Sequence, residues 1–449
     1  MTDPLPILPF RRPAAARARV PGSKSLTNRG LILAAMCAER VELRGALFGD
    51  DTAVLCDALR ALGLQIDADP AASTIAVQGC GGRIPRASAS LFTGLSGTSA
   101  RFLTALCAAA SRGTYRIDGT ERMRERPMAG LFDALASQGT SFRWLGKPGF
   151  LPVEIEPCGL RGGSVIVDAR ESSQMLSGLL MAAPLARTPL EVGVHGGVRQ
   201  PFVEMTIRQA AAFGVNFTSR DDRYLAPAGS RYSRTAPYPI EPDATAASYF
   251  MALPIATGGR VAVDGLVGPD ESLQGDVAFA GVLRDCGLEV NFGADGVAAR
   301  RTDGLRGTTA DFSGFSDTFL TLAALAPLLE GPTRITGVAH TRKQETDRVA
   351  GAAAELRRLG QEVEETEDSI EIHPRPLKSG QTIRTYGDHR FAMSFGILGC
   401  HDLAGDGTPW LSIADPGCCA KTFPGFFDEL AACRTFALPR QETPENPTP

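Results

Sequence analysis

Glycine follows the end of a helix-like segment at a regular interval along the chain. The segments LRALG, LASQG, AAAFG, LRDCG and LRRLG recur every 73 to 76 residues and end at Gly63, Gly139, Gly214, Gly287 and Gly360. A glycine just past a helix is the residue that most easily adopts the left-handed conformation that stops it. Each glycine therefore predicts a helix end, and the same spacing places a sixth near Cys433 in FFDELAACR.

Apolar and polar residues alternate after these glycines. In LQIDADPAASTIAVQG and QEVEETEDSIEIHP the alternation is interrupted once by turn residues, which is typical of a strand, a turn and a second strand. Six units of about 74 residues, each with helices and strands, nearly fill the chain and predict an α/β repeat architecture. Chance recurrence is the alternative interpretation, because Leu-x-x-x-Gly is common at helix ends.

A chain of 449 residues is too long for one ordinary hydrophobic core, so two or more domains are expected. The segment RTAPYPIEPDATAASYF holds three prolines near residue 240 and follows the third unit. It predicts a boundary between two lobes, and we expect the chain to cross between them a second time near residue 21. The polar, proline-rich tail PRQETPENPTP is predicted to be disordered.

Polar clusters recur where a loop is expected to enter a helix. They are GSKSLTNR (22–29), LSGTSAR (95–101), DARESSQ (168–174), HTRKQETDR (340–348), GDHR (387–390) and CCAKTFP (418–424). Helix amino termini attract anions, although a serine or threonine there is by itself more often a helix cap. The cations in or beside these clusters therefore matter most, and they predict a cleft for a substrate with several anionic groups. These cations are Lys24, Arg29, Arg101, Arg126, Arg348, Arg390 and Lys421.

Composition excludes several other classes of protein. The formal net charge of −4 argues against nucleic acid or an anionic membrane as the main partner. No nucleotide P-loop, dinucleotide fingerprint or metal-binding spacing is present. The ten cysteines lack a Cys-x-x-Cys pair, which favours free thiols in a reducing compartment. Without a secretory signal or an apolar run long enough to span a bilayer, the chain is predicted to be cytoplasmic.

Two carboxylates stand among these cations. Asp317 lies in the otherwise apolar run GFSDTFLTLAALA, and Glu345 precedes Arg348 by three residues. That spacing predicts that Glu345 and Arg348 lie on one face of a helix. Such carboxylates are ordinarily ionised partners of the cations; the alternative function is an acid–base pair for proton transfer.

In order, GSKSLTNR, SGTSAR, RMRERP, SSQ, ETDR, DHR and AKTFP resemble the 5-enolpyruvylshikimate-3-phosphate synthase family, from about residue 21 to 427. The resemblance implies two lobes, each of three βαβαββ-type units, the inside-out barrel of enolpyruvyl transferases. The first lobe would span residues 22–241. The second would combine residues 1–21 with 242–436, leaving 437–449 as the tail.

The resemblance also implies an activity. Family members transfer the enolpyruvyl group of phosphoenolpyruvate to the 5-hydroxyl of shikimate 3-phosphate and release phosphate, a step of the shikimate pathway toward aromatic amino acids. The family includes the target of glyphosate. A monomer without cofactor or metal is expected, with no nucleic-acid or membrane partner.

Residue by residue, Asp317 matches the family's proton acceptor, and Glu345 with Lys24 its proton-handling pair. The phosphoenolpyruvate shell is matched by Lys24, Gly97, Arg126, Gln174, Arg348, Arg390 and Lys421. The shikimate 3-phosphate shell is matched by Lys24, Ser25, Arg29, Ser172, Ser173, Gln174, Asp317 and Gln344.

The chain departs from the family pattern mainly on the acceptor side. Gln344 stands where a lysine is frequent, and Arg342 and Lys343 just upstream offer replacement charge. The other departures are Leu95 for Asn, Arg199 for Ser, Phe202 for Tyr and His340 for Asn. These departures keep open a paralogue with a modified cyclohexene acceptor. A sister transferase acting on UDP-N-acetylglucosamine, an inactive anion-binding homologue and a related fold of RNA-end chemistry are further alternatives.

Overall fold

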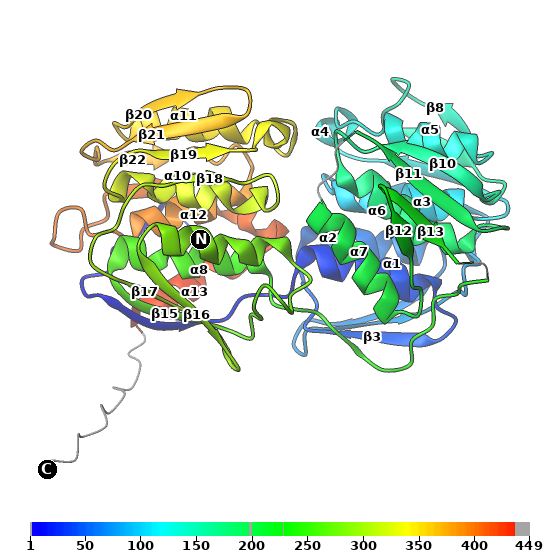
Figure 1. Cartoon of the computed structure of the whole chain (residues 1–449), viewed down its shortest axis with the longest axis horizontal. Coiled ribbons are helices and arrows are strands. Elements are labelled where there is room, and N and C mark those ends of the chain that lie inside the picture. The colour runs from blue at the N-terminus through cyan, green and yellow to red at the C-terminus, as the bar shows by residue number, and fades with distance from the viewer. Residues whose placement is uncertain (1, 197–199, 228, 436–449) are drawn as a thin grey trace, which may run out of the picture.

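Two lobes lie side by side, and the chain passes between them twice (Figure 1). The structure, a computed structural model, describes residues 2–196, 200–227 and 229–435. One hydrophobic core joins buried side chains of residues 26 to 240. A separate core joins residues 7 to 18 to residues 244 to 433. The two cores divide near residues 22 and 241, where the sequence predicts the passages between lobes; lobes of 22–241 and of 1–21 with 242–436 remain a proposal.

Each unit of the first lobe runs strand, helix, parallel strand, helix and antiparallel hairpin, which confirms the predicted βαβαββ order. The first unit contains β14 (Tyr238–Pro239), α1 (Lys24–Met36), β3 (Arg40–Arg44), α2 (Asp50–Ala61), β4 (Gln65–Asp69) and β5 (Thr74–Gln78). The second contains β6 (Ser88–Phe92), α3 (Gly97–Ala108), β7 (Thr114–Asp118), α4 (Glu121–Arg124), α5 (Ala129–Ser137), β8 (Ser141–Trp144) and β9 (Val153–Glu156). The third contains β10 (Gly163–Asp168), α6 (Ser173–Ala182), η1 (Ala183–Leu185), β11 (Leu190–His195), α7 (Gln200–Ala212), β12 (Thr218–Arg220) and β13 (Arg223–Ala226).

The second lobe repeats this order. The fourth unit contains β2 (Ala14–Ala18), α8 (Ala244–Thr257), β15 (Gly259–Asp264), η2 (Gly275–Ala278), α9 (Phe279–Asp285), β16 (Leu288–Gly293) and β17 (Gly296–Arg301). The fifth contains β18 (Thr309–Asp311), η3 (Ser316–Thr318), α10 (Phe319–Leu325), η4 (Ala326–Leu328), β19 (Thr333–Thr336), η5 (Ala339–Lys343), α11 (Arg348–Arg358), β20 (Glu362–Glu365) and β21 (Ser369–His373). The sixth contains β22 (Gln381–Ile383), α12 (His389–Gly399), β23 (Leu411–Ile413), η6 (Pro416–Lys421) and α13 (Phe426–Thr435), with β1 (Leu5–Pro6) in place of the hairpin.

Strands are exchanged where the chain passes between the lobes. β2, from the amino-terminal segment, pairs in parallel with β15 of the second lobe. β14, from the end of the first lobe, pairs in parallel with β3 at its beginning. The two passages run antiparallel beside each other, since Ser23 N–H donates to the Glu241 carbonyl and Asp243 N–H to the Pro21 carbonyl, both at 2.8 Å. Helices α1 and α8, which begin directly after the two passages, therefore start next to the other lobe.

The glycine pattern has the structural meaning that the sequence predicts. Gly63, Gly139, Gly214, Gly287 and Gly360 have φ values of 97°, 105°, 89°, 95° and 92°. All five follow a helix and precede a hairpin, so the predicted stops are confirmed. The sixth stop differs, because α13 continues past Cys433 to Thr435. The predicted disordered tail lies outside the described residues.

The structure also shows how long the apolar helices are and where the cysteines lie. No helix in the described part of the chain is both long and apolar enough to cross a lipid bilayer. The ten cysteines are free thiols, most of them buried in the two cores.

We expect Gly287→Ala to destabilise the protein and Gly281→Ala to stabilise it. A Cβ at Gly287 would lie 2.9 Å from the Gly304 carbonyl oxygen on backbone with positive φ, whereas nothing lies within 4 Å of a Cβ at Gly281. The first change should cost about 1–2 kcal/mol, and the second should gain up to about 1 kcal/mol by removing a helical glycine. Urea and thermal unfolding would measure the change in stability of both variants. Equal changes in the two variants would contradict the role of Gly287 as a helix stop.

Candidate active site

A cavity lies between the two lobes, with about 700 Å³ of empty space that is partly open to solvent. The first lobe contributes Lys24, Ser25, Arg29, Thr98, Arg101, Arg126, Pro127, Glu171, Ser172, Ser173, Gln174 and Phe202. The second lobe contributes Asp317, His340, Lys343 and Gln344. Polar motifs more than 300 residues apart in the sequence thus meet in one cleft.

The predicted site residues that do not line this cavity are connected to those that do, either directly or through other site residues. Gly97 lies against the Arg126 guanidinium, and Arg348 contacts both Asp317 and Glu345. Arg390 pairs with Asp317, and Lys421 with Glu345. The structure therefore brings all the sequence-predicted residues together.

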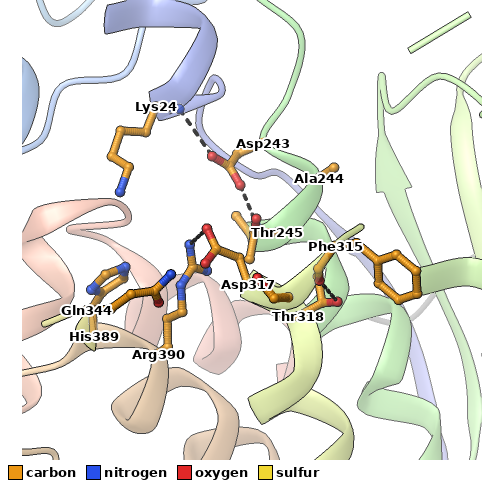
Figure 2. Close-up of polar contacts among 12 residues, drawn as sticks. Lys24, Asp243, Ala244, Thr245, Phe315, Asp317, Thr318, Gln344, His389 and Arg390 are labelled. Carbon is orange, nitrogen blue, oxygen red and sulfur yellow. Dashed lines mark hydrogen bonds and ion pairs between the residues drawn. The ribbon is translucent and has the colours of Figure 1, made fainter. Parts of the chain in front are cut away.

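The opening motif lies inside α1 and not in a loop before it. The sequence predicts that a polar loop enters a helix at GSKSLTNR, but α1 already begins at Lys24, and the Ser23 side chain forms no capping bond. The main-chain N–H of Lys24 donates to Asp243 Oδ2 at 3.1 Å, a contact with the second lobe. The Lys24 side chain extends toward the second-lobe side chains of His389 and Gln344 (Figure 2). Its Nζ lies 3.8 Å from Asp51 Oδ2.

Arg29 is a buried cation whose described hydrogen-bond partners are all neutral. Its guanidinium donates to the hydroxyls of Thr206 at 2.8 Å and Ser177 at 3.2 Å, and to the carbonyls of Ser25 and Phe202. Burial lowers the pKa of Arg29 to about 9, so it remains protonated at neutral pH. A buried charge held only by neutral dipoles is best compensated by an anion in the adjoining cavity.

Gly97 is the first residue of α3, and its missing side chain makes room for two guanidinium groups. A Cβ there would lie 2.5 Å from Arg101 Nη1 and 2.8 Å from Arg126 Cζ. Arg126 donates to the Leu95 carbonyl at 3.1 Å, and Arg101 donates to Gln174 Oε1 at 2.9 Å. The glycine thus sets how closely these cations approach the helix terminus, where an anion is favoured.

Arg348 connects the carboxylates of the second lobe. Its Nε lies 2.8 Å from Asp388 Oδ2, its Nη1 3.1 Å from Asp317 Oδ1 and its Nη2 3.0 Å from Glu345 Oε2. The Gln344 amide oxygen also accepts a hydrogen bond from Nη1. Only 2% of the Arg348 side chain is exposed, so these partners replace its water.

Asp317 lies in η3, where it is shared between two arginines. Its Oδ2 lies 2.6 Å from Arg390 Nη2, on the side opposite Arg348, as Figure 2 shows for the Arg390 pair. Burial acts to raise the pKa of Asp317, but Arg390, Arg348 and Lys24 outweigh it and hold this pKa at about 2. The carboxylate is ionised and only weakly basic while both arginines hold it.

Glu345 lies in the turn before α11, so the expectation that it shares a helix face with Arg348 is wrong. The helix begins only at Arg348 because Asp347 caps it, accepting from Ala350 N–H. The turn still points Glu345 at Arg348 and at Lys421, whose Nζ lies 2.7 Å from Oε1. Burial acts to raise the pKa of Glu345, but Lys421 and Arg348 keep it well below its usual value. Both carboxylates are thus ion-pair partners here, as one interpretation predicts.

Two contacts join the lobes at the mouth of the cavity. Lys343 Nζ lies 3.1 Å from the Glu171 carboxylate, and Arg122 donates to the Gln344 carbonyl at 3.1 Å. Arg342 instead bonds Asp347 and the carbonyls of Glu367 and Thr366, away from the cavity. Of the two upstream cations, only Lys343 lines the cleft.

Sequence reasoning missed some residues of the site. Asp388 is fully buried and holds both Arg348 and the main-chain N–H of Arg390, although it lies inside the quoted motif DHR. Arg101 also lines the cavity, although the sequence indicates it only as one of the cations beside a helix start. Of the departures, His340 Nε2 lies 2.7 Å from the Ser316 hydroxyl, and Arg199 lies outside the described residues. Within the described residues, no group of three or more His, Cys, Asp or Glu could hold a metal ion.

Comparison with known proteins yields one family. The model of the EPSP synthase (3-phosphoshikimate 1-carboxyvinyltransferase) family matches residues 11–430. A 3-phosphoshikimate 1-carboxyvinyltransferase of Opitutus terrae is 55% identical over 441 residues, covering 98% of this chain and 99% of the relative. One of a Nostoc strain is 42% identical, covering 95% of this chain and 98% of the relative.

Solved structures agree with this likeness. An EPSP synthase from Acinetobacter baumannii superposes with a TM-score of 0.78 at 26% identity, covering 96% of this chain and 98% of that one. The enolpyruvyl transferase NikO from Streptomyces tendae superposes with a TM-score of 0.73. At 18% identity it is evidence for the fold alone.

We expect Asp317→Asn to lower the free energy of unfolding at pH 7 by at least about 2 kcal/mol, since two buried arginines lose a carboxylate. Because the pKa of Asp317 is about 2 rather than 3.8, this stability is complete above pH 4 and is lost as the pH falls toward 2. Unfolding measured against pH would test this. Asp67→Asn, which breaks an exposed pair with Arg40, is the matched control and should cost under about 1 kcal/mol. If the free energies of unfolding of wild type and Asp317→Asn differed by the same amount at every pH, the prediction would be contradicted.

Proposed function

The chain belongs to the EPSP synthase family, and from this we propose that it transfers the enolpyruvyl group of phosphoenolpyruvate to the 5-hydroxyl of shikimate 3-phosphate, with release of phosphate. The observation that carries the proposal is the attachment of two carboxylates, Asp317 and Glu345, to one buried guanidinium at the edge of a cationic cleft. The reaction causes no net change of oxidation state and so needs no redox cofactor.

The donor is proposed to bind between the lobes. Its phosphate and carboxylate would be held by Arg126 with Gly97 and Gln174 on one side, and by Arg348, Arg390 and Lys421 on the other, with Lys24 between them. The forked donors of arginine suit both groups. The closeness of Arg126 to Gly97 supports this arrangement.

Donor binding changes the basicity of the two carboxylates. An anion that takes up the hydrogen bonds of Arg348, Arg390 or Lys421 draws these cations away from Asp317 and Glu345. Each carboxylate then loses the partner that lowers its pKa while remaining buried, and both effects raise the pKa. The carboxylates become able to exchange protons only when the donor is present.

The chemistry proposed is addition followed by elimination. Asp317 accepts the proton of the acceptor hydroxyl as the hydroxyl oxygen bonds to C2 of the donor, and Glu345, with Lys24, delivers a proton to C3. In the second step a proton leaves C3, the carbon–oxygen bond to phosphate breaks and the enolpyruvyl double bond re-forms. The position of the cleft between the two lobes would limit the access of water to the intermediate.

The acceptor is proposed to lie on the first-lobe side, against Ser25, Arg29, Ser172, Ser173 and Gln174, with Gln344 closing the cleft. The neutral surroundings of Arg29 support a role in holding its anionic groups. Lys343 lines the same cavity and is proposed to supply the charge that Gln344 lacks. The cytoplasmic location and the monomeric state remain predictions.

We expect the purified protein to release phosphate from phosphoenolpyruvate with shikimate 3-phosphate and not with UDP-N-acetylglucosamine. Asp317→Ala should lower kcat at least about 100-fold, because general-base catalysis contributes about that much. A phosphate-release assay measures both. Release with neither acceptor would favour the paralogue with a different acceptor or the inactive homologue.

Gly97→Ala should raise the KM for phosphoenolpyruvate by about tenfold or more, corresponding to about 1.4 kcal/mol of binding, because the new methyl group displaces Arg126. The KM for shikimate 3-phosphate should change by less than about twofold in the same variant. Steady-state kinetics with each substrate varied would measure this, with the remote Gly281→Ala as control. An unchanged donor KM would refute the role given to Arg126 and Gly97.

A further inference from the structure

A second cavity lies beside the first, on the far side of Asp317. It holds about 420 Å³ of empty space, part of which is open to solvent. Lys24, Ser25, Phe202 and Asp317 line both cavities, so Asp317 stands at the passage between them. Asp276 lines only the second cavity.

Three carboxylates face the second cavity, but their oxygens are engaged differently. Asp243 accepts the main-chain N–H of Ala246 with Oδ1 and that of Lys24 with Oδ2. Asp317 uses both oxygens for Arg348 and Arg390. Asp276 accepts a hydrogen bond from Thr245, while its Oδ1 is buried without a partner among the described residues. Only 5% of Asp276 is exposed.

Such an orphaned oxygen is costly to bury, and an ionised carboxylate more so. Asp276 belongs to η2, which packs on η3, the segment that carries Asp317. The charged groups that face the cavity around it are Asp317 of η3, Arg390 of α12, Asp243 at the start of α8 and Lys24 of α1. Asp276 is the member of this set with a free site for a proton.

We propose that Asp276 holds the proton removed from the acceptor hydroxyl, receiving it from Asp317 across the second cavity. This role rests on the proposed function, because it completes the proton path of that reaction. In this proposal Asp276 does not contact the substrate. It acts through Asp317, by taking up and returning the proton that Asp317 removes.

The protons balance over the cycle. The O–H bond of the acceptor breaks as its electron pair forms the bond to C2, and the proton passes to Asp317 and on to Asp276. The proton that Glu345 gives to C3 returns to Glu345 in the elimination. The proton on Asp276 goes back through Asp317 to the departing phosphate oxygen, so neither carboxyl is changed at the end.

The two carboxyls differ in basicity in the direction that this path requires. In the substrate-free protein two arginines keep the pKa of Asp317 at about 2, and Asp317 starts from this low value when donor binding raises its pKa. Burial, helped by the nearby charge of Asp317, raises the pKa of Asp276 to about 7. At neutral pH Asp276 is close to half protonated, the condition under which a group both accepts and returns protons efficiently.

Asp276→Asn tests the proposal, because the amide preserves shape but binds no proton. We expect kcat to fall about 10- to 100-fold, while both KM values stay within about twofold of wild type. In the wild type kcat should rise with pH through about 7, since Asp276 must start deprotonated, and in the variant this inflection should vanish. Asp276→Glu should restore both the inflection and most of kcat. Asp285→Asn, an exposed change at the end of α9, is the matched control and should alter nothing.

A second readout is independent of turnover. Infrared difference spectra of the substrate-free protein should contain a carboxyl band that disappears with rising pH near 7 and is absent from Asp276→Asn. Wild-type protein that lacks turnover but shows this band would contradict the proposed function, whereas active protein without the band overturns the role of Asp276. A variant that keeps wild-type kcat, or loses kcat with an unchanged pH profile and a lowered Tm, also overturns it.

Discussion

Charge balance around the Arg348 guanidinium constrains the whole site. Burying an ion costs several kcal/mol unless partners replace its hydration. Arg348 meets this cost with three carboxylates, those of Asp388, Asp317 and Glu345, and the last two are shared with Arg390 and Lys421. Three cations and three carboxylates thus form a network without excess charge inside the second lobe.

The first lobe contributes cations that lack this compensation. The described hydrogen-bond partners of Arg29 and Arg126 are hydroxyl groups and carbonyl oxygens. Under the proposed function, an anionic substrate would be stabilised by the first lobe and, by competing for the arginines of the second, would change the basicity of Asp317 and Glu345. Binding and catalysis would then be coupled through the same few hydrogen bonds, and a water-filled cleft would weaken that coupling.

The strand exchange between lobes explains how such distant residues are held in register. β14 completes the sheet of the first lobe and β2 that of the second, so neither lobe is complete without both passages of the chain. The passages flank the start of α1, and Glu241 between them is fixed by Ser272, Leu273 and Gln274 of the second lobe. Lys24 is placed at the cleft by this junction and not by its own helix.

Local signals in the sequence determined much of the architecture. The five glycines predicted helix ends, because a positive φ is a property of one residue and its neighbours. The hairpins after them followed from alternation with period two, and the polar motifs, taken together, indicated the family and the set of residues that meet in the cleft. The start of α1 and the turn that holds Glu345 were misjudged because capping by Asp347 and contact with Asp243 depend on precise chain geometry.

Only the tertiary structure decided which carboxylate holds which cation. Asp388 bonds to Arg348, Lys343 pairs with Glu171, and Asp276 lines the same cavity as Asp317. The two residues of each pair lie 40 to 172 positions apart in the sequence. No local pattern encodes such pairs, because they arise where two lobes and their short helices pack together. The charge and hydrogen-bonding groups are properties of the sequence, whereas their basicity comes from burial and from neighbours that folding supplies.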